Sequence, residues 1–100
     1  QTSIAKAISI AQNGTDVLYV TVCSDVLDAA ANPQWPFDPC GLTSFEVAMM
    51  LHEAGKAGAE AFDFVEIYPE PFGGHQSAHS ACWMALYYMN GLAQHRAKLV

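Results

Sequence analysis

Hydrophobic and polar residues follow patterns along the first half of the chain that predict one helix and one strand. Residues 4–11 carry apolar side chains at helical spacing, and Asn13-Gly14 follows them as a helix stop. Residues 17–22 (VLYVTV) are short, β-branched or aromatic, and apolar on both faces. This pattern is typical of a strand that helices cover on both sides.

The second half predicts a helix, a strand and a last helix. Residues 43–46 (TSFE) match a capping box, so a helix begins there, and Gly55 or Gly58 ends it. Residues 61–67 (AFDFVEI) predict a second strand, and the last helix begins near Ser77. The expected inward positions of this helix are Ala81, Cys82, Ala85, Leu86 and Met89.

The order of these elements predicts an α/β fold. Two strands joined by a helix indicate a parallel pair with a right-handed crossover and helices on both faces, which makes a three-layer α/β/α arrangement. Long loops follow both strands, and residues 29–42 contain three prolines. Because two strands cannot bury both faces of a sheet alone, we expect the remaining strands to come from outside this chain.

Composition supports a partial domain. The hydrophobic share is 52% and the charged share is 14%, whereas an average soluble domain has about 25% charged residues. A small free-standing domain has much surface to cover and normally needs more charge. Together with a first residue, Gln1, that is not methionine, this predicts a part of a larger assembly.

Several classes of function are disfavoured. A net charge of −6 argues against nucleic-acid binding, which requires a basic surface. No apolar run approaches the ~20 residues of a membrane helix, so no membrane partner is expected. The three cysteines lack the spacing of a disulfide framework or a zinc finger. They fit a reducing compartment and predict a cytoplasmic protein.

Acidic residues and a thiol stand where both predicted strands end. Cys23 and Asp25 follow the first strand, Asp28 lies on the turn beyond, and Glu66 ends the second strand. Parallel strands place their carboxyl ends at one edge of the sheet, where ligands bind in open α/β folds. If the backbone stays extended, residues 23 and 25 point to the same side and could hold a metal ion.

Each of these residues also has a structural interpretation. Asp25 could cap the following turn, and Glu66 could form a salt bridge with a neighbouring helix. Cys23 could be a small buried hydrophobic residue, a metal ligand or a catalytic nucleophile.

Other side chains have open roles. His75 and His79 have i, i+4 spacing, which suits a metal, helix capping or a pocket wall. Residues 69–76 are expected to supply one wall of the substrate site, which makes His75 a candidate substrate-binding residue. The remaining expectations are a substrate wall or sheet-edge packing for Trp35 and Phe37, core or loop positions for Cys40 and Cys82, a surface position for His52, and core or subunit-interface positions for Tyr87, Tyr88 and Met89.

Two motifs resemble the ureohydrolases, the family of arginase, agmatinase and formiminoglutamase. The segment "LYVTVCSDVLDAAANP…CGLTSFE" is similar to the family pattern of a strand, Ser-x-Asp-x-Asp-x-x-Asp-Pro, a loop and Gly-Leu-Thr. Thr21 takes the place of the serine, and Cys23, Asp25 and Asp28 take the places of the three aspartates. The segment "FDFVEIYP" is similar to the second signature, Val-Glu-x-x-Pro, which contains Glu66.

The resemblance implies a hydrolase that cleaves a C–N bond of a guanidino or formimino compound with two manganese ions. By position, Asp25 is a metal ligand, Cys23 replaces the acid that bridges both ions, Asp28 braces the loop and takes part in substrate binding, and Glu66 is the substrate-facing catalytic glutamate. Cys23 is a departure, because a thiol suits nickel or zinc better than manganese.

A second departure concerns the rest of the site. The family's other ligands lie in Gly-Gly-Asp-His and Asp-Ala-His-x-Asp segments, which are not in this chain. Residues 1–100 are therefore expected to be the C-terminal portion of one ureohydrolase-like domain, completed by a missing N-terminal portion or a companion chain, in a homo-oligomer. The alternative is a pseudoenzyme or a structural or regulatory subunit that has lost the metal site.

Overall fold

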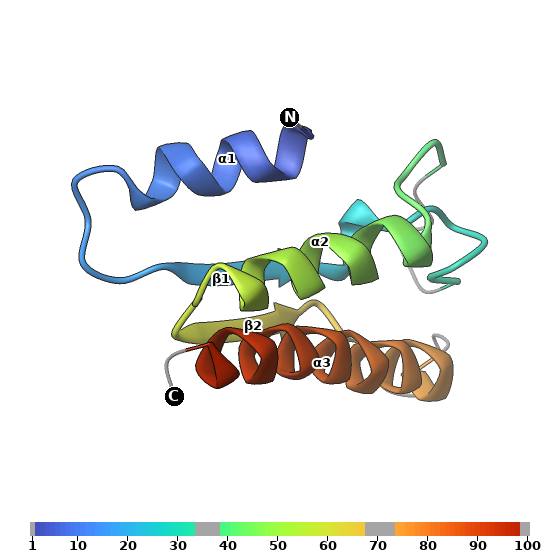
Figure 1. Ribbon diagram of the computed structural model, residues 1–100. Coiled ribbons are helices and arrows are strands. Elements are labelled where there is room, and N and C mark those ends of the chain that lie inside the picture. The colour runs from blue at the N-terminus through green and yellow to red at the C-terminus, as the bar shows by residue number, and fades with distance from the viewer. Residues whose placement is uncertain (1, 34–38, 68–73, 99–100) are drawn as a thin grey trace.

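The computed structural model describes residues 2–33, 39–67 and 74–98. The elements follow the predicted order of helix, strand, helix, strand, helix (Figure 1). They are α1 (Ser3–Gln12), β1 (Tyr19–Cys23), the short 3-10 helix η1 (Ser24–Val26), α2 (Ser44–Lys56), β2 (Ala61–Val65) and α3 (Gly74–Ala97).

The two strands form a parallel pair, as the sequence predicts. Tyr19 is opposite Ala61 and Cys23 is opposite Val65 in the register. β1 begins two residues later than predicted, although the N–H of Glu60 donates to the carbonyl of Leu18 just before the paired region. Among the described residues the sheet has these two strands alone.

The predicted caps of α1 and α2 are present. The Thr2 hydroxyl caps α1, which ends before Asn13. In α2 the Thr43 hydroxyl accepts from the Glu46 N–H, and the Glu46 carboxylate accepts from the Thr43 N–H. This reciprocal capping box satisfies two N–H groups that the helix itself leaves unpaired.

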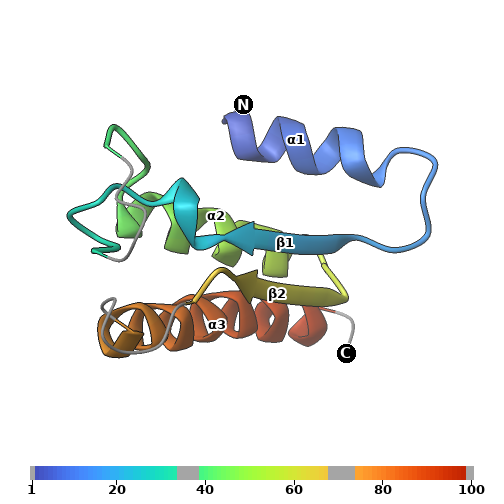
Figure 2. The ribbon, with the colours of Figure 1, turned by 180° about the vertical axis from the view of Figure 1, so that it is seen from behind.

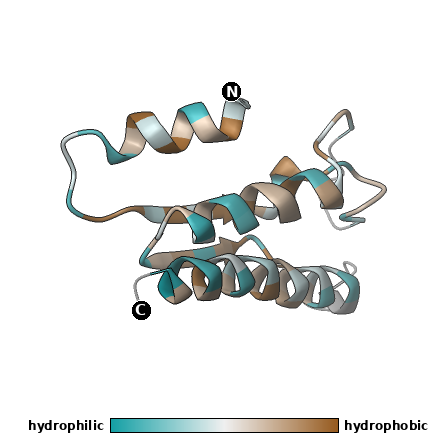
Figure 3. Cartoon of the chain, in the orientation of Figure 1, coloured by the Kyte–Doolittle hydropathy of each residue, from teal (hydrophilic) through white to brown (hydrophobic). Residues whose placement is uncertain are grey.

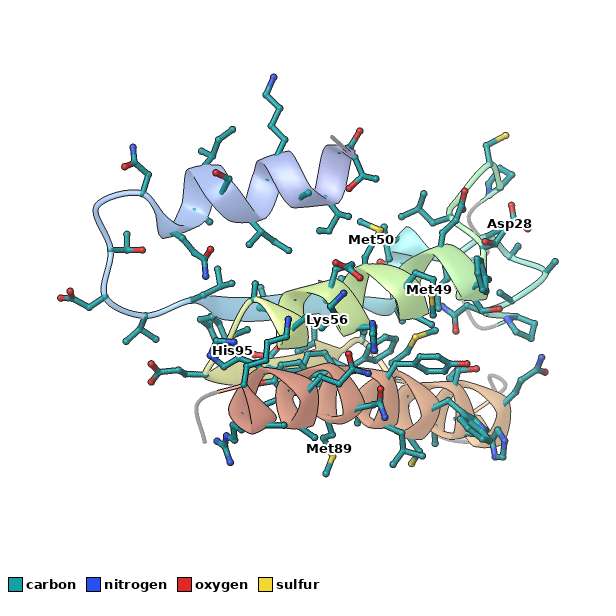
Figure 4. The ribbon with its side chains drawn as sticks, in the orientation of Figure 1. Asp28, Met49, Met50, Lys56, Met89 and His95 are labelled. Carbon is teal, nitrogen blue, oxygen red and sulfur yellow. The ribbon has the colours of Figure 1, made fainter. Side chains whose placement is uncertain are left out.

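A side chain of α3 contacts the last residue of α2. The ring Nδ1 of His95 lies 3.0 Å from the carbonyl oxygen of Lys56, and Figure 4 shows the two residues side by side. The chain then leaves the helix through Gly58, which has a φ of +89°. This left-handed conformation favours glycine.

Helices α2 and α3 cover one face of the two strands (Figures 1 and 2). Alternate strand residues, namely Val20, Val22, Phe62 and Phe64, pack against the core on this face. The buried core consists of Leu27, Val47, Ala48, Leu51, Ala54, Ala59, Met84 and Tyr88. The other face of the sheet carries Tyr19, Thr21 and Asp63, and Tyr19 is 55% exposed there.

The predicted inward face of α3 is wrong. Cys82, Leu86 and Met89 are exposed, and Met84 and Tyr88 are buried in their place. Hydrophobic and hydrophilic residues are interleaved along this helix (Figure 3), so periodicity did not identify the packed face. The helix also begins at Gly74, three residues before the predicted start.

The packed face of α3 follows a line of close contact with α2. A Cβ added at Gly91 would collide with the His52 carbonyl oxygen, and one added at Gly55 would collide with the Tyr88 carbonyl oxygen. Both glycines therefore let the helix backbones approach closely. Figure 4 shows Met89 on the side of α3 that faces away from α2.

α1 lies beyond the edge of β1 that faces away from β2 in both views (Figures 1 and 2). An open groove separates them, lined mainly by apolar side chains that include Ile4, Ile8, Val22 and Met50. Within the described residues, no helix combines the length and apolar character needed to cross a membrane.

Tyr88 provides a test of the core. Its hydroxyl donates to the Ala59 carbonyl at 2.6 Å, and its ring lies 5.0 Å from that of Phe62. Burial raises the pKa of Tyr88 above its usual value of 10.0. Tyr88→Phe will lower the unfolding free energy by about 1 kcal/mol, because one buried carbonyl loses its partner.

The raised pKa of Tyr88 determines how folding stability changes at alkaline pH. The unfolded chain releases the Tyr88 proton near its ordinary pKa of 10.0, whereas the folded chain retains it to higher pH. Wild-type stability will therefore fall as the pH rises above about 10, and Tyr88→Phe will lose part of this dependence. Urea unfolding at neutral and alkaline pH measures both effects, and an unchanged alkaline profile would contradict the burial of Tyr88.

Candidate functional site

The carboxyl ends of both strands lie at one edge of the sheet, as predicted. Both arrowheads in Figure 1 point to the same side. Cys23 and Val65 are partners in the register, so η1 and Glu66 follow at adjacent positions. We call Cys23, Asp25 and Glu66 the strand-end site.

Burial and two nearby acids act on the Cys23 thiol. The pKa of its thiol is raised above 9.0, first by burial, while the backbone N–H of Asp25 acts in the opposite direction. The negative charge and side-chain hydrogen bond of Asp25 raise the pKa further, and so does the charge of Glu66. The thiol is therefore protonated at neutral pH, which makes Cys23 a poor nucleophile and a poor metal ligand until it loses its proton.

Asp25 lies within η1 and not on an extended strand. The expected extended backbone, in which residues 23 and 25 would point to the same side, is therefore wrong, because the chain coils into a 3-10 turn at Ser24. The Oδ1 atom of Asp25 is buried and has no hydrogen-bond partner among the described residues. A buried carboxylate oxygen without a partner is costly, so this atom fits a cation or donor supplied from elsewhere.

Asp28 holds two loop segments together. Its Oδ2 accepts from the Ala30 N–H at 3.0 Å and its Oδ1 accepts from the Gly41 N–H at 3.3 Å. Gly41 is needed here, because a Cβ would lie 2.5 Å from the backbone nitrogen of Asp28. Leu27 and Leu42 form a parallel bridge at the same point. These contacts give Asp28 the bracing role that the resemblance implies.

Several residues that the sequence singles out have no described side chain. Trp35, Phe37 and residues 68–73 lie outside the described residues, and so does the side chain of His75, which belongs to the first turn of α3. His79 is exposed and accepts a hydrogen bond from the indole N–H of Trp83 at 3.0 Å. Within the described ranges, no three His, Cys, Asp or Glu side chains are grouped so that they could hold a metal ion.

The remaining residues that the sequence singled out differ in how far they are exposed. Cys40 and Cys82 are exposed, His52 is half-buried against Asn90, and Tyr87 and Met89 are exposed beside the buried Tyr88. All three cysteines are free thiols. Sequence reasoning missed three buried polar residues, Ser24, Asn32 and Ser77. Small polar residues outside any periodic pattern gave no signal that they would be buried.

Cys23 and Cys82 are expected to differ in how fast their thiols are alkylated. Cys23 will be alkylated more slowly than the exposed Cys82 at about pH 8, because its pKa is raised and the thiolate is the reacting form. The difference between the two alkylation rates will become smaller as the pH rises above 9.0. Mass spectrometry of pulse-alkylated protein gives both rates, and equal rates at about pH 8 would contradict the environment described for Cys23.

Comparisons with known proteins agree on one family. A model of the arginase family matches residues 1–90. The structure of formimidoylglutamase from Bacillus subtilis subsp. subtilis str. 168 superposes with a TM-score of 0.83 at 22% identity, covering 91% of this chain and 29% of that protein. No curated protein matches this chain.

A second solved structure has the same fold. Agmatine ureohydrolase of Thermoplasma volcanium superposes with a TM-score of 0.78 at 19% identity, over 100% of this chain and 34% of that protein. The chain thus spans about a third of the length of the structures it matches. These likenesses show the arginase-like α/β fold, of which the chain represents a part.

Proposed function

The chain belongs to the arginase family, and on that premise we propose that it is part of a binuclear metal-dependent hydrolase acting on a linear amidine. The reaction is cleavage of a C–N bond in a guanidino or formimino compound. One observation carries the proposal. Asp25 presents a buried carboxylate oxygen that has no hydrogen-bond partner among the described residues, at the edge of a parallel sheet where such sites are built.

Residues outside this chain complete the site in this proposal. The described residues contain two strands and no group that could hold a metal ion, and the matched structures are about three times longer. We place residues 1–100 at the C-terminal portion of one domain, whose other strands and ligands come from the rest of the protein or a companion chain. Assembly as a homo-oligomer in the reducing cytoplasm belongs to the same proposal, and the free thiols support that location.

The proposed roles follow from the chemistry of each side chain. Asp25 would hold a metal ion through its buried oxygen, and manganese suits an oxygen ligand. A pair of such ions would supply Lewis-acid activation of water and charge stabilisation. Glu66 binds the planar cationic amidine through charge-assisted hydrogen bonds. Asp28 would fix the loop beside the substrate, and His75, from the segment expected to supply one wall of the site, would bind substrate.

A pseudoenzyme is the second candidate, and Cys23 is the observation that favours it. Its thiol stands where the family has an acid, so one metal position would be weakened, altered to nickel or zinc, or lost. Cys23→Asp in the whole protein tests this. Increased manganese occupancy would indicate a degenerate family site, whereas unchanged occupancy would show that residue 23 does not face the ions.

Glu66→Gln tests the proposed reaction. We expect kcat/KM for the best guanidino or formimino substrate to fall about 100-fold, because a charge-assisted bond to the amidine is lost. Metal content will remain unchanged. The assay is release of urea, ammonia or formamide from a panel of such compounds, with Glu60→Gln on the exposed turn before β2 as the matched control. Equal loss in both variants, or no loss in Glu66→Gln, would contradict the assigned role.

A further inference from the structure

Three polar side chains are buried in the described part of the chain, and they are bonded in series. Ser24 is 0% exposed, Asn32 is 4% exposed and Ser77 is 1% exposed. They come from η1, from the loop after it and from the first turns of α3. Burying polar groups in this way is unfavourable unless each has a partner, so their bonding pattern is informative.

The series ends on the backbone of Glu66. The Ser77 hydroxyl donates to Asn32 Oδ1 at 2.9 Å, and Asn32 Nδ2 donates to the Ser24 carbonyl at 3.1 Å. The Ser24 hydroxyl then donates to the Glu66 carbonyl at 2.5 Å. We call Ser24, Asn32 and Ser77 the polar clamp. It joins the end of β1, the end of β2 and α3 through two buried hydrogen bonds and one partly buried hydrogen bond.

Glu66 has a strained backbone at the point where the clamp holds it. Its φ is +66°, a left-handed conformation that costs a residue other than glycine roughly 1–2 kcal/mol. Such a conformation persists where surrounding contacts determine it, and it is common at functional sites. It redirects the chain directly after β2 and therefore sets the direction in which the Glu66 side chain leaves the strand.

The same clamp restrains Asp25. Ser24 stands between Cys23 and Asp25 in η1, and its carbonyl and hydroxyl are bonded to Asn32 and Glu66 respectively. Ser24 therefore links the backbone next to Asp25 in η1 with the backbone of Glu66, which follows β2.

We propose that Ser24, Asn32 and Ser77 are positioning residues that hold Glu66 in its left-handed conformation and fix its carboxylate relative to Asp25. This inference rests on the proposed function, because it assigns Glu66 to the substrate. None of the three residues touches the substrate in this proposal. A displacement of about 1 Å at a catalytic group can lower a rate on the order of 100-fold, so loosening the clamp has a large kinetic consequence.

Ser24→Ala and Ser77→Ala in the whole protein test the proposal. Both variants will lower kcat/KM for the amidine substrate by about 10- to 100-fold while retaining their bound metal. Ser77→Thr, which restores the hydroxyl, will recover most of the activity lost in Ser77→Ala. Tyr88→Phe is the matched control, because it also removes one buried hydrogen bond but lies away from the clamp. It will lose stability and keep wild-type kcat/KM.

A second measurement separates this inference from the proposed function. Hydrogen exchange of a peptide covering residues 62–67 will be faster in Ser77→Ala than in wild type, although residue 77 is distant in sequence. Unchanged exchange, or wild-type kcat/KM in both alanine variants, would overturn the inference. If wild type hydrolyses no amidine, the proposed function fails, and the exchange data alone decide whether the clamp controls Glu66.

Discussion

Asp25→Asn in the whole protein will lose most of its bound metal and its hydrolase activity and will keep its fold. The change preserves the shape of a side chain whose Oδ1 has no hydrogen-bond partner in the described structure, so no described contact of that atom is broken. It removes the negative charge that a metal ligand supplies. Groups that merely orient a ligand alter metal affinity by about 10- to 100-fold, and loss of a ligand will exceed that range.

The measurement is metal content by mass spectrometry, followed by thermal unfolding with and without added manganese. Manganese will raise the melting temperature of wild type, because a ligand bound to the folded state stabilises it, and it will have a much smaller effect on Asp25→Asn. Asp16→Asn, in the exposed segment before β1, is the matched control. Equal metal content in the two variants would remove Asp25 from the metal site.

Gly91→Ala will destabilise the protein by about 1–3 kcal/mol, which is the range for overpacking a tight contact. An exposed helical position would show the opposite sign, since alanine is favoured over glycine there by about 1 kcal/mol. Gly91 is buried, and an added Cβ would collide with the His52 carbonyl oxygen of α2. The two helix backbones would have to separate, which disturbs the core around Tyr88.

Gly14→Ala is the control for this change. Gly14 has a φ of +76° with nothing near the added Cβ, so alanine there loses about 1 kcal/mol through backbone strain alone. Urea unfolding gives both free energies. A stabilised Gly91→Ala would show that α2 and α3 do not pack as closely as described.

Local signals in the sequence were sufficient to predict the elements and their order. The capping box at residues 43–46 placed the start of α2, and Asn13-Gly14 placed the end of α1. The short apolar runs gave a parallel pair because a helix joins them. Each of these features depends on neighbouring residues, which is the information that periodicity and capping rules use.

The features that the sequence did not predict are determined by tertiary contacts. The packed face of α3 is set by Gly55 and Gly91, whose role appears only when two helices meet. The 3-10 turn at Asp25 and the left-handed Glu66 lie on either side of a tertiary hydrogen bond from Ser24 to Glu66, which joins the two strand ends. Local rules predict extended backbone at both places. The approximate location of the strand-end site was therefore predictable, and the geometry that holds its acids was not.

The metal content of the purified whole protein tests the central claim most directly. The proposal of a binuclear amidine hydrolase predicts close to two divalent ions per subunit, as paired-ion hydrolysis requires, and their loss on chelation will abolish activity. A correctly folded protein that binds no divalent ion after incubation with manganese, nickel or zinc would contradict the proposal and favour the pseudoenzyme.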